Sequence, residues 1–282
     1  MKRVLLTGAT GFVGRQVLRH LVAEGAAVTV TLRPGTDLPE GAAAAIHTPD
    51  LFAESAAFWQ SACAGQDAVA HVAWYAEPGK YLQSPINLAC LAGTLNLAKG
   101  AAAAGVRHFT GVGTCFEYDL TSPALARHEP LTTDAPLVPA TPYGAAKAAA
   151  CLALSRALPG MGMGFAWCRL FYLFGAGEDP RRLVPYVHAR LAAGLPVELT
   201  SGQQERDFLD VAEAGRQIAE VVLSGREGAL NICSGEAVTV AALACRIADG
   251  YGRGDLIRLG ARPDRADDPP YVVGVPSLPP KA

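Results

Sequence analysis

A chain of 282 residues has room for one large domain, or for a nucleotide-binding domain with a smaller attachment. Half of its residues are hydrophobic and 18% are charged, which allows a sizeable core and excludes an intrinsically disordered protein. The net charge is -2 and Lys and Arg form no runs, so nothing favours nucleic acid or an anionic membrane as a partner. We also find no apolar run long enough to span a membrane.

Cysteine and histidine usage gives no sign of a disulfide framework or a metal centre. The seven cysteines are scattered without a C-x-x-C pair, which is typical of reduced thiols in a cytosolic protein. The six histidines never stand at the spacing of zinc ligands, so we expect no metal site.

Apolar runs alternate with helical stretches through the first two-thirds of the chain. The runs predicted to be buried strands are 4–6, 28–32, 68–72, 109–112 and 165–170. The stretches predicted to be helices between them are 12–23, 85–104 and 144–158. Continuous apolar strands that alternate with helices are typical of parallel sheets covered on both faces. The sequence therefore predicts an α/β fold with a doubly wound parallel sheet.

The pattern loosens after Arg169, where Gly and Pro become frequent and the helical stretches shorten. We predict a dinucleotide-binding domain made of 1–170 and about 201–224, with a helix at 211–223 that returns to the sheet. A smaller C-terminal α/β substrate-binding domain would consist of 171–200 and 225–282.

A glycine-rich stretch directly follows the first predicted strand and opens the first predicted helix. Its glycines permit a tight turn and the close approach of a pyrophosphate, which the helix N-terminus would stabilise. The strand before it and the helix after it agree with this interpretation. We therefore expect a dinucleotide to bind at Gly8, Thr10, Gly11, Phe12, Val13 and Gly14.

The end of the second predicted strand indicates which dinucleotide binds. NAD sites of this type place a carboxylate there to hold the ribose 2′-hydroxyl, whereas an Arg accommodates a 2′-phosphate. This chain has Leu32 and Arg33 at that point and no acidic residue before Asp37. We therefore predict NADP(H), with NAD(H) as the alternative if Arg33 is only a solvated loop residue.

Tyr143 and Lys147 stand four residues apart in a stretch with strong helix propensity, so their side chains share one helix face. A nearby ammonium favours the phenolate, and we expect Lys147 to lower the pKa of Tyr143 so that the phenol can transfer a proton. The same four-residue spacing also arises by chance in surface Tyr/Lys pairs. It is stronger evidence for an active site here because a dinucleotide site is predicted upstream.

The glycine loop and the Tyr143–Lys147 pair together resemble the extended short-chain dehydrogenase/reductases, specifically the nucleotide-sugar epimerase/dehydratase/reductase group. The resemblance covers nearly the whole chain and implies a Rossmann-type fold. Segment 113–119 is similar to the family's Ser-Ser/Thr-x-x-x-Tyr-Gly element, which implies that Thr114 hydrogen-bonds the substrate carbonyl oxygen. It also implies that Lys147 holds the nicotinamide ribose. The further cofactor contacts that it implies are Asp50, Leu51 and Ala73.

The resemblance extends to residues that would bind a nucleotide-diphosphate sugar. Tyr172 stands where the family usually has an Asn, Arg206 lies in an Arg-Asp-Phe-x-x-Val signature, and Arg265 would clamp the diphosphate. Either Arg can instead be a solvated or ion-paired residue. The full set of expected substrate contacts is Trp74, Cys115, Phe116, Tyr172, Arg206 and Arg265. Asn87 and Asn231 also match family positions, with a structural role as the alternative.

The residues after Thr114 bear on the reaction. Dehydratases of the family resemble one another in an Asp-Glu pair at this point, because elimination needs an additional acid and base. This chain has Cys115 and Phe116 instead, which disfavours 4,6-dehydration. Leu32 in place of a carboxylate argues mildly against an epimerase that retains NAD, and Arg33 fits a reductase.

We therefore expect a cytoplasmic enzyme that uses NADPH to reduce the C4 keto group of a nucleotide-linked 4-keto-6-deoxyhexose, similar to ketoreductases of the abequose/paratose/6-deoxytalose synthase type. The alternatives are an NAD-dependent 4-epimerase, a reductase of a non-sugar carbonyl, and a non-catalytic NADP-binding regulator. The resemblance also implies a homodimer formed through helices 85–104 and 144–158. The nucleotide base and the stereochemistry at C4 stay open.

Overall fold

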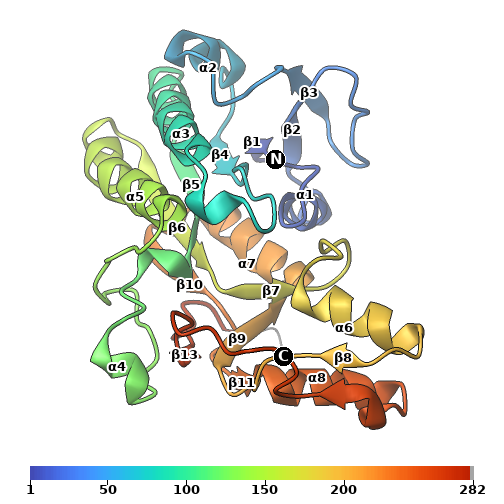
Figure 1. Ribbon diagram of the computed structural model, residues 1–282. Helices are drawn as coiled ribbons and strands as arrows, with labels where there is room; N and C mark the ends of the chain where they lie inside the picture. Colours follow the sequence, from blue (N-terminus) through green and yellow to red (C-terminus); the bar gives the residue numbers. More distant parts are fainter. Residues whose placement is uncertain (280–282) are drawn as a thin grey trace.

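The computed structural model describes residues 1–279 and is built around a large sheet in which all neighbouring strands run parallel (Figure 1). In spatial order its strands are β10 (Gly228–Ile232), β6 (Gly164–Leu170), β5 (His108–Thr114), β4 (Ala68–His71), β1 (Arg3–Thr7), β2 (Ala27–Leu32) and β3 (Ala44–His47). The order changes direction between β1 and β4, which is where doubly wound sheets bind ligands. The predicted fold class is confirmed.

Helices cover both faces of this sheet because its strands are apolar on both sides. One face packs against α1 (Gly14–Ala23) and α7 (Val211–Ser224), which contact each other. The other face packs against α2 (Ala56–Ala62), α3 (Ile86–Ala103) and α5 (Pro142–Gly160). Trp59 and Trp167 are fully buried in this second layer. Packing between these two apolar layers fixes where the carboxyl ends of the strands lie.

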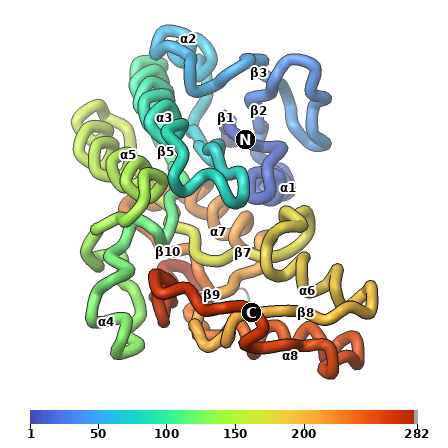
Figure 2. The backbone as a smooth tube through the Cα atoms, viewed as in Figure 1, coloured from blue at the N-terminus to red at the C-terminus, as the bar shows by residue number. Residues whose placement is uncertain are grey.

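A smaller region is assembled mostly from shorter strands and helices of the second half of the chain (Figure 2). A four-stranded sheet contains β7 (Tyr172–Phe174), β9 (Glu205–Asp210), β11 (Ala237–Thr239) and β13 (Tyr271–Val272). A two-stranded sheet pairs β8 (Val197–Glu198) with β12 (Ile257–Arg258). The accompanying helices are α4 (Pro123–Ala126), α6 (Leu183–Ala192) and α8 (Val240–Gly250). Of the 3-10 turns, η3 (Gly254–Leu256) packs against α8 in this region, whereas η1 (Tyr81–Gln83) and η2 (Cys115–Glu117) pack against α5.

The predicted strands and helices are present, with small differences at their ends. The first helix starts at Gly14 rather than at residue 12, because the Gly11 N–H donates to the Gly8 carbonyl and keeps the intervening residues in a turn. The sequence analysis did not predict β3, α2 or β10, which are short and carry weak periodicity.

Sheet membership differs from the predicted domain division at two strands. β9, which lies within 201–224, pairs with β7, β11 and β13 in the smaller sheet. β10, which lies within 225–282, instead extends the large sheet beside β6. The division into two domains stays a prediction, and these pairings show that the chain passes between the two sheets more often than the sequence indicates.

Residues 1–279 also show whether membrane-spanning helices, metal clusters or disulfides are present among them. None of the helices there combines the length and apolarity required to cross a bilayer. The same residues contain no group of three or more His, Cys, Asp or Glu side chains suited to a metal ion. The seven cysteines, all within this range, are free thiols, and Cys245 alone among them is exposed.

Candidate active site

A cavity of about 2030 Å³ opens at the carboxyl ends of the central strands, between the large sheet and the smaller region. The residues that line it come from many segments of the chain, from the loop after β1 to the segment after β12. The expected cofactor residues that line it are Gly8, Thr10, Gly11, Phe12, Val13, Gly14, Arg33, Asp50, Leu51, Ala73 and Lys147. The expected catalytic and substrate residues that line it are Trp74, Thr114, Cys115, Phe116, Tyr143, Tyr172, Arg206 and Arg265.

The glycine loop between β1 and α1 has no room for side chains at two of its positions. A Cβ placed on Gly14 would lie 1.9 Å from the Gly8 carbonyl oxygen. A Cβ on Gly8, whose φ is +77°, would lie 2.8 Å from the Ala73 nitrogen. This tight backbone brings the N-terminal N–H groups of α1 to the cavity wall, where a diphosphate can accept them. The loop therefore fits a dinucleotide.

A buried histidine ties this loop to the neighbouring strands. Thr7 Oγ1 lies 2.8 Å from His71 Nδ1, and His71 Nε2 lies 2.9 Å from Thr94 Oγ1. The Thr94 hydroxyl donates to the Cys90 carbonyl, so it accepts from Nε2 and leaves Nδ1 to accept from Thr7. Burial lowers the pKa of His71 to about 3, which keeps the ring neutral. This network sets the spacing between the ends of β1 and β4.

The end of the cavity beyond β2 contains the residues expected near the adenosine. Arg33 is exposed there, directly after Leu32. Asp50 accepts a hydrogen bond from the Phe52 N–H at 2.9 Å, so this carboxylate shapes its own turn. The guanidinium of Arg33 thus lies on the cavity wall directly after β2.

Local sequence explains how α5 presents Tyr143 and Lys147. The Thr141 hydroxyl accepts from the Gly144 N–H and Pro142 occupies the first turn, which together start the helix just before Tyr143. Lys147 follows one turn later and is 2% exposed. Its ammonium donates to the Val112 carbonyl at the end of β5 and lies 3.9 Å from the centre of the Trp74 ring.

The protonation of this pair differs from the sequence expectation. Burial raises the pKa of Tyr143 far above its usual range, and neighbouring Tyr81 adds to the rise, whereas a hydrogen bond with Thr114 opposes it. Burial also lowers the pKa of Lys147 to about 7. The expectation of a lowered pKa for Tyr143 is therefore wrong for this structure, because desolvation of the buried phenol is the largest influence on it. The phenol is held in its protonated form.

The two family asparagines make structural contacts. Asn87 Oδ1 accepts from the Trp74 indole at 2.8 Å, and its amide donates to the carbonyls of Tyr81 and Ser84. Asn231 Oδ1 accepts from the Tyr118 hydroxyl at 2.6 Å. The Asn87 side chain therefore orients the Trp74 indole, whose ring the Lys147 ammonium contacts.

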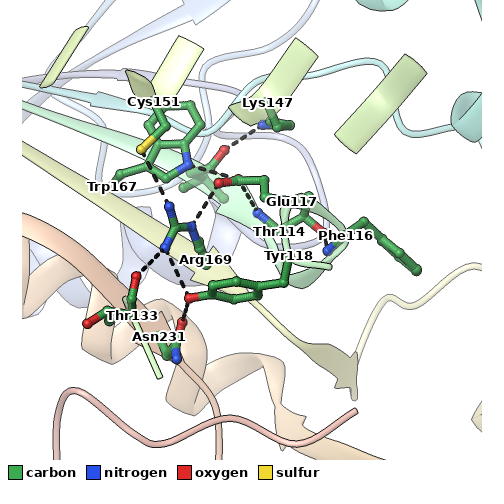
Figure 3. Close-up of polar contacts among 11 residues, drawn as sticks. Thr114, Phe116, Glu117, Tyr118, Thr133, Lys147, Cys151, Trp167, Arg169 and Asn231 are labelled. Atoms are coloured by element: carbon green, nitrogen blue, oxygen red, sulfur yellow. Dashed lines mark hydrogen bonds and ion pairs between the residues drawn. The ribbon is translucent and has the colours of Figure 1, made fainter. Parts of the chain in front are cut away.

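A buried ion pair beneath Thr114 was missed by the sequence analysis (Figure 3). Glu117 accepts from the Thr114 N–H at 2.9 Å, from the Trp167 indole at 2.9 Å and from Arg169 Nε at 2.8 Å. Arg169 also donates to the Tyr118 hydroxyl. Because Glu117 is buried and touches the Thr114 backbone, the pair supports the residue expected to contact the substrate. A charged residue inside an apolar segment was the signal that could have identified it.

The two expected substrate arginines differ in their surroundings. Arg206 is 3% exposed, is ion-paired with Asp268 at 2.5 Å and lies 5.4 Å from the centre of the Tyr172 ring. The side chain of Arg265 is 77% exposed and pairs with Asp267 at 3.4 Å. Both line the cavity, but Arg206 alone of the two is held rigidly.

Three further residues on the cavity wall lie outside the sequence predictions. Tyr81 packs edge-on against Tyr143 with ring centres 4.8 Å apart. Phe208 packs against Tyr172 with ring centres 6.0 Å apart. Burial raises the pKa of Glu178 to about 7, and one of its carboxylate oxygens is buried without a partner. These residues come from segments that only the tertiary structure brings to the cavity.

Comparison with known proteins agrees with this geometry. The sequence profile described as "NAD dependent epimerase/dehydratase family" matches residues 4–233. The dTDP-6-deoxy-L-talose 4-dehydrogenase (NAD(+)) of Aggregatibacter actinomycetemcomitans is 26% identical over 83% of this chain and 84% of its own. The dTDP-glucose 4,6-dehydratase of Streptomyces griseus is 30% identical over 80% of this chain and 71% of its own. A solved structure of UDP-N-acetylglucosamine 4-epimerase from Methanobrevibacter ruminantium M1 superposes with a TM-score of 0.83 at 20% identity, covering 99% of this chain and 93% of the other.

Proposed function

The chain belongs to the NAD dependent epimerase/dehydratase family, and from this premise we propose that it is an NADPH-dependent reductase of a nucleotide-linked 4-keto-6-deoxyhexose, acting on the C4 carbonyl. The observation that carries the proposal is the wall beside Tyr143. Cys115 and Phe116 follow Thr114 on η2, where elimination chemistry would need an acid and a base. Burial raises the pKa of the Cys115 thiol to about 12, so it stays protonated and is a poor base. Proton delivery from Tyr143 then suffices for reduction.

The roles of the chain's own residues follow from their positions. A bound nicotinamide cofactor would supply the hydride. Tyr143 donates its hydroxyl proton to the substrate oxygen as negative charge develops there, and the Thr114 hydroxyl donates a hydrogen bond to the same oxygen. The raised pKa of Tyr143 supports this direction of reaction, because reduction requires the phenol to begin protonated. Lys147, anchored between Val112 and Trp74, is assigned to the nicotinamide ribose.

The cofactor preference is proposed from Arg33. This exposed guanidinium at the end of β2 would pair with a 2′-phosphate, and the preceding Leu32 offers no acceptor for a ribose hydroxyl. A net reductase must exchange its cofactor in each cycle, and NADPH fits that requirement. NADH is the alternative, and the same assays with both cofactors distinguish them.

The nucleotide part of the substrate is proposed to bind at the arginines of the smaller region. Arg206 is buried with its guanidinium over Tyr172, and it would face the nucleotide. Arg265 is exposed on the cavity wall and would bind the diphosphate, to which an Arg fork is well matched.

A homodimer is also proposed, through α3 and α5. The side chains of Leu88 on α3 and Leu152 on α5 are 68% and 55% exposed, although α3 and α5 already pack together. A second copy would cover this apolar surface. Size-exclusion chromatography with light scattering of wild type and of the double variant Leu88→Asp and Leu152→Asp tests this, and a wild-type monomer would contradict it.

The central experiment follows NADPH oxidation with a panel of dTDP-, UDP-, GDP- and CDP-4-keto-6-deoxyglucose, with the product identified by NMR. We expect turnover with one of them, and Tyr143→Phe should reduce it by about 10²–10³-fold or more with unchanged NADPH affinity. Tyr251→Phe, outside the cavity, is the matched control. Interconversion of a C4 epimer pair without net NADPH oxidation would identify the 4-epimerase instead. Turnover retained in Tyr143→Phe would exclude Tyr143 as the acid.

A further inference from the structure

Aromatic rings from several separate segments surround the end of the cavity at which Tyr143 lies. Phe116 on η2 lies 6.5 Å from Tyr143 between ring centres, and Tyr172 on β7 lies 6.3 Å from Phe116. Tyr81 and Trp74 also pack against Tyr143, at 4.8 Å and 6.5 Å. We call this surface the aromatic wall, and its members are Trp74, Tyr81, Phe116, Tyr172 and Phe208.

Phe116 occupies the centre of this wall. Its ring contacts both Tyr143 and Tyr172 edge-on, and it carries no hydrogen-bonding atom. The Cys115 thiol beside it is 2% exposed and stays protonated, so it is at best a weak partner for a substrate hydroxyl. The Thr114 hydroxyl is assigned to the reacting oxygen. The surface formed by Phe116 and Cys115 therefore favours an apolar group on the substrate.

The position of the substrate oxygen determines which group meets Phe116. In the proposed orientation Tyr143 and Thr114 both contact the carbonyl oxygen at C4, so the C6 group on the adjacent ring carbon C5 would lie against Phe116. A methyl group there buries apolar surface against the ring and is stabilised. A hydroxyl in the same place loses water without gaining a full partner, which costs roughly tenfold to a hundredfold in affinity. A carboxylate is disfavoured more strongly, because burying an unpaired charge costs more.

We propose that Phe116 is a specificity-determining residue, whose ring selects the C6 methyl group of a 6-deoxyhexose and rejects a C6 hydroxyl or carboxylate. This inference rests on the proposed function, because it places a nucleotide-linked sugar in this cavity. It goes further by assigning the discrimination to one ring at the centre of the aromatic wall, supported on either side by Tyr143 and Tyr172.

Equilibrium binding measures this selection without turnover. The NADP-loaded enzyme is titrated calorimetrically with dTDP-6-deoxyglucose and with dTDP-glucose, which differ by one oxygen atom, and then with the corresponding UDP, GDP and CDP pairs. Wild type should bind the 6-deoxy sugar at least about tenfold more tightly. Phe116→Asn should abolish that preference, whereas Phe116→Leu, which stays apolar, should keep it. The NADPH affinity of each variant is measured as well, and an unchanged value shows that its cavity is still folded.

The outcomes separate the two proposals. Equal affinity of wild type for both sugars, or a preference that survives in Phe116→Asn, overturns the role of Phe116 and leaves the reductase proposal standing. Binding of none of the dTDP, UDP, GDP and CDP sugars contradicts the nucleotide-sugar function itself and the inference with it.

Discussion

Replacing Glu117 by Gln removes the negative charge from a carboxylate that is buried against Arg169. The two side chains are 0% and 3% exposed, and Glu117 accepts three hydrogen bonds, from Thr114, Trp167 and Arg169. The amide keeps one acceptor oxygen, so it loses at least one of these bonds and leaves the guanidinium without its counter-charge. Uncompensated buried charges of this kind cost about 3–5 kcal/mol in the free energy of unfolding.

Urea denaturation followed by tryptophan fluorescence measures this loss, since Trp167 contacts the replaced group. The double variant Glu117→Gln with Arg169→Met should recover part of it, because the second change removes the unpaired charge. Glu129→Gln is the control: it breaks an ion pair with Arg127 at 2.6 Å whose members are both more than half exposed, and it should leave the unfolding free energy unchanged. A loss below about 1 kcal/mol for Glu117→Gln, or a double variant that loses the sum of the single changes, would refute this reasoning.

Two further predictions concern the cofactor loop. Because the pKa of His71 falls from 6.5 in the unfolded chain to about 3 in the folded one, the unfolded state binds the extra proton between these values. The free energy of unfolding should therefore decrease as the pH falls below about 6.5, by roughly 2–3 kcal/mol at pH 4.5 relative to pH 6.5. His71→Gln should lack this component when the urea midpoints of the two proteins are compared. Parallel pH profiles of wild type and variant would contradict the prediction. Gly14→Ala should weaken NADPH binding at least about tenfold in a fluorescence titration, because its Cβ would lie 1.9 Å from the Gly8 oxygen. The control Gly250→Ala, with no atom within 4 Å of its Cβ, should bind NADPH normally. Unchanged affinity in Gly14→Ala would show that the loop tolerates a side chain.

The sequence determined the parts of this protein that depend on local pattern. Continuous apolar strands alternating with helices require a sheet covered on both faces, and the fold class is confirmed. The glycine loop and the Tyr143–Lys147 pair could be predicted because each is a short motif with its own geometric reason, whereas Thr114 was predicted only from the resemblance to a family. The spacing of Tyr143 and Lys147 places them on one helix face whatever surrounds them.

Tertiary structure alone decided the environment of these groups. Whether Lys147 or burial controls the pKa of Tyr143 depends on how many rings close around the phenol, and those rings come from distant segments. The Glu117–Arg169 pair joins residues on separate elements, so a charged residue inside an apolar segment can be noticed in the sequence but its partner cannot. The passage of β9 and β10 to different sheets likewise depends on long-range pairing. Local periodicity specifies which elements form, whereas the free energy of burial, which depends on every neighbour in space, sets what their side chains can do.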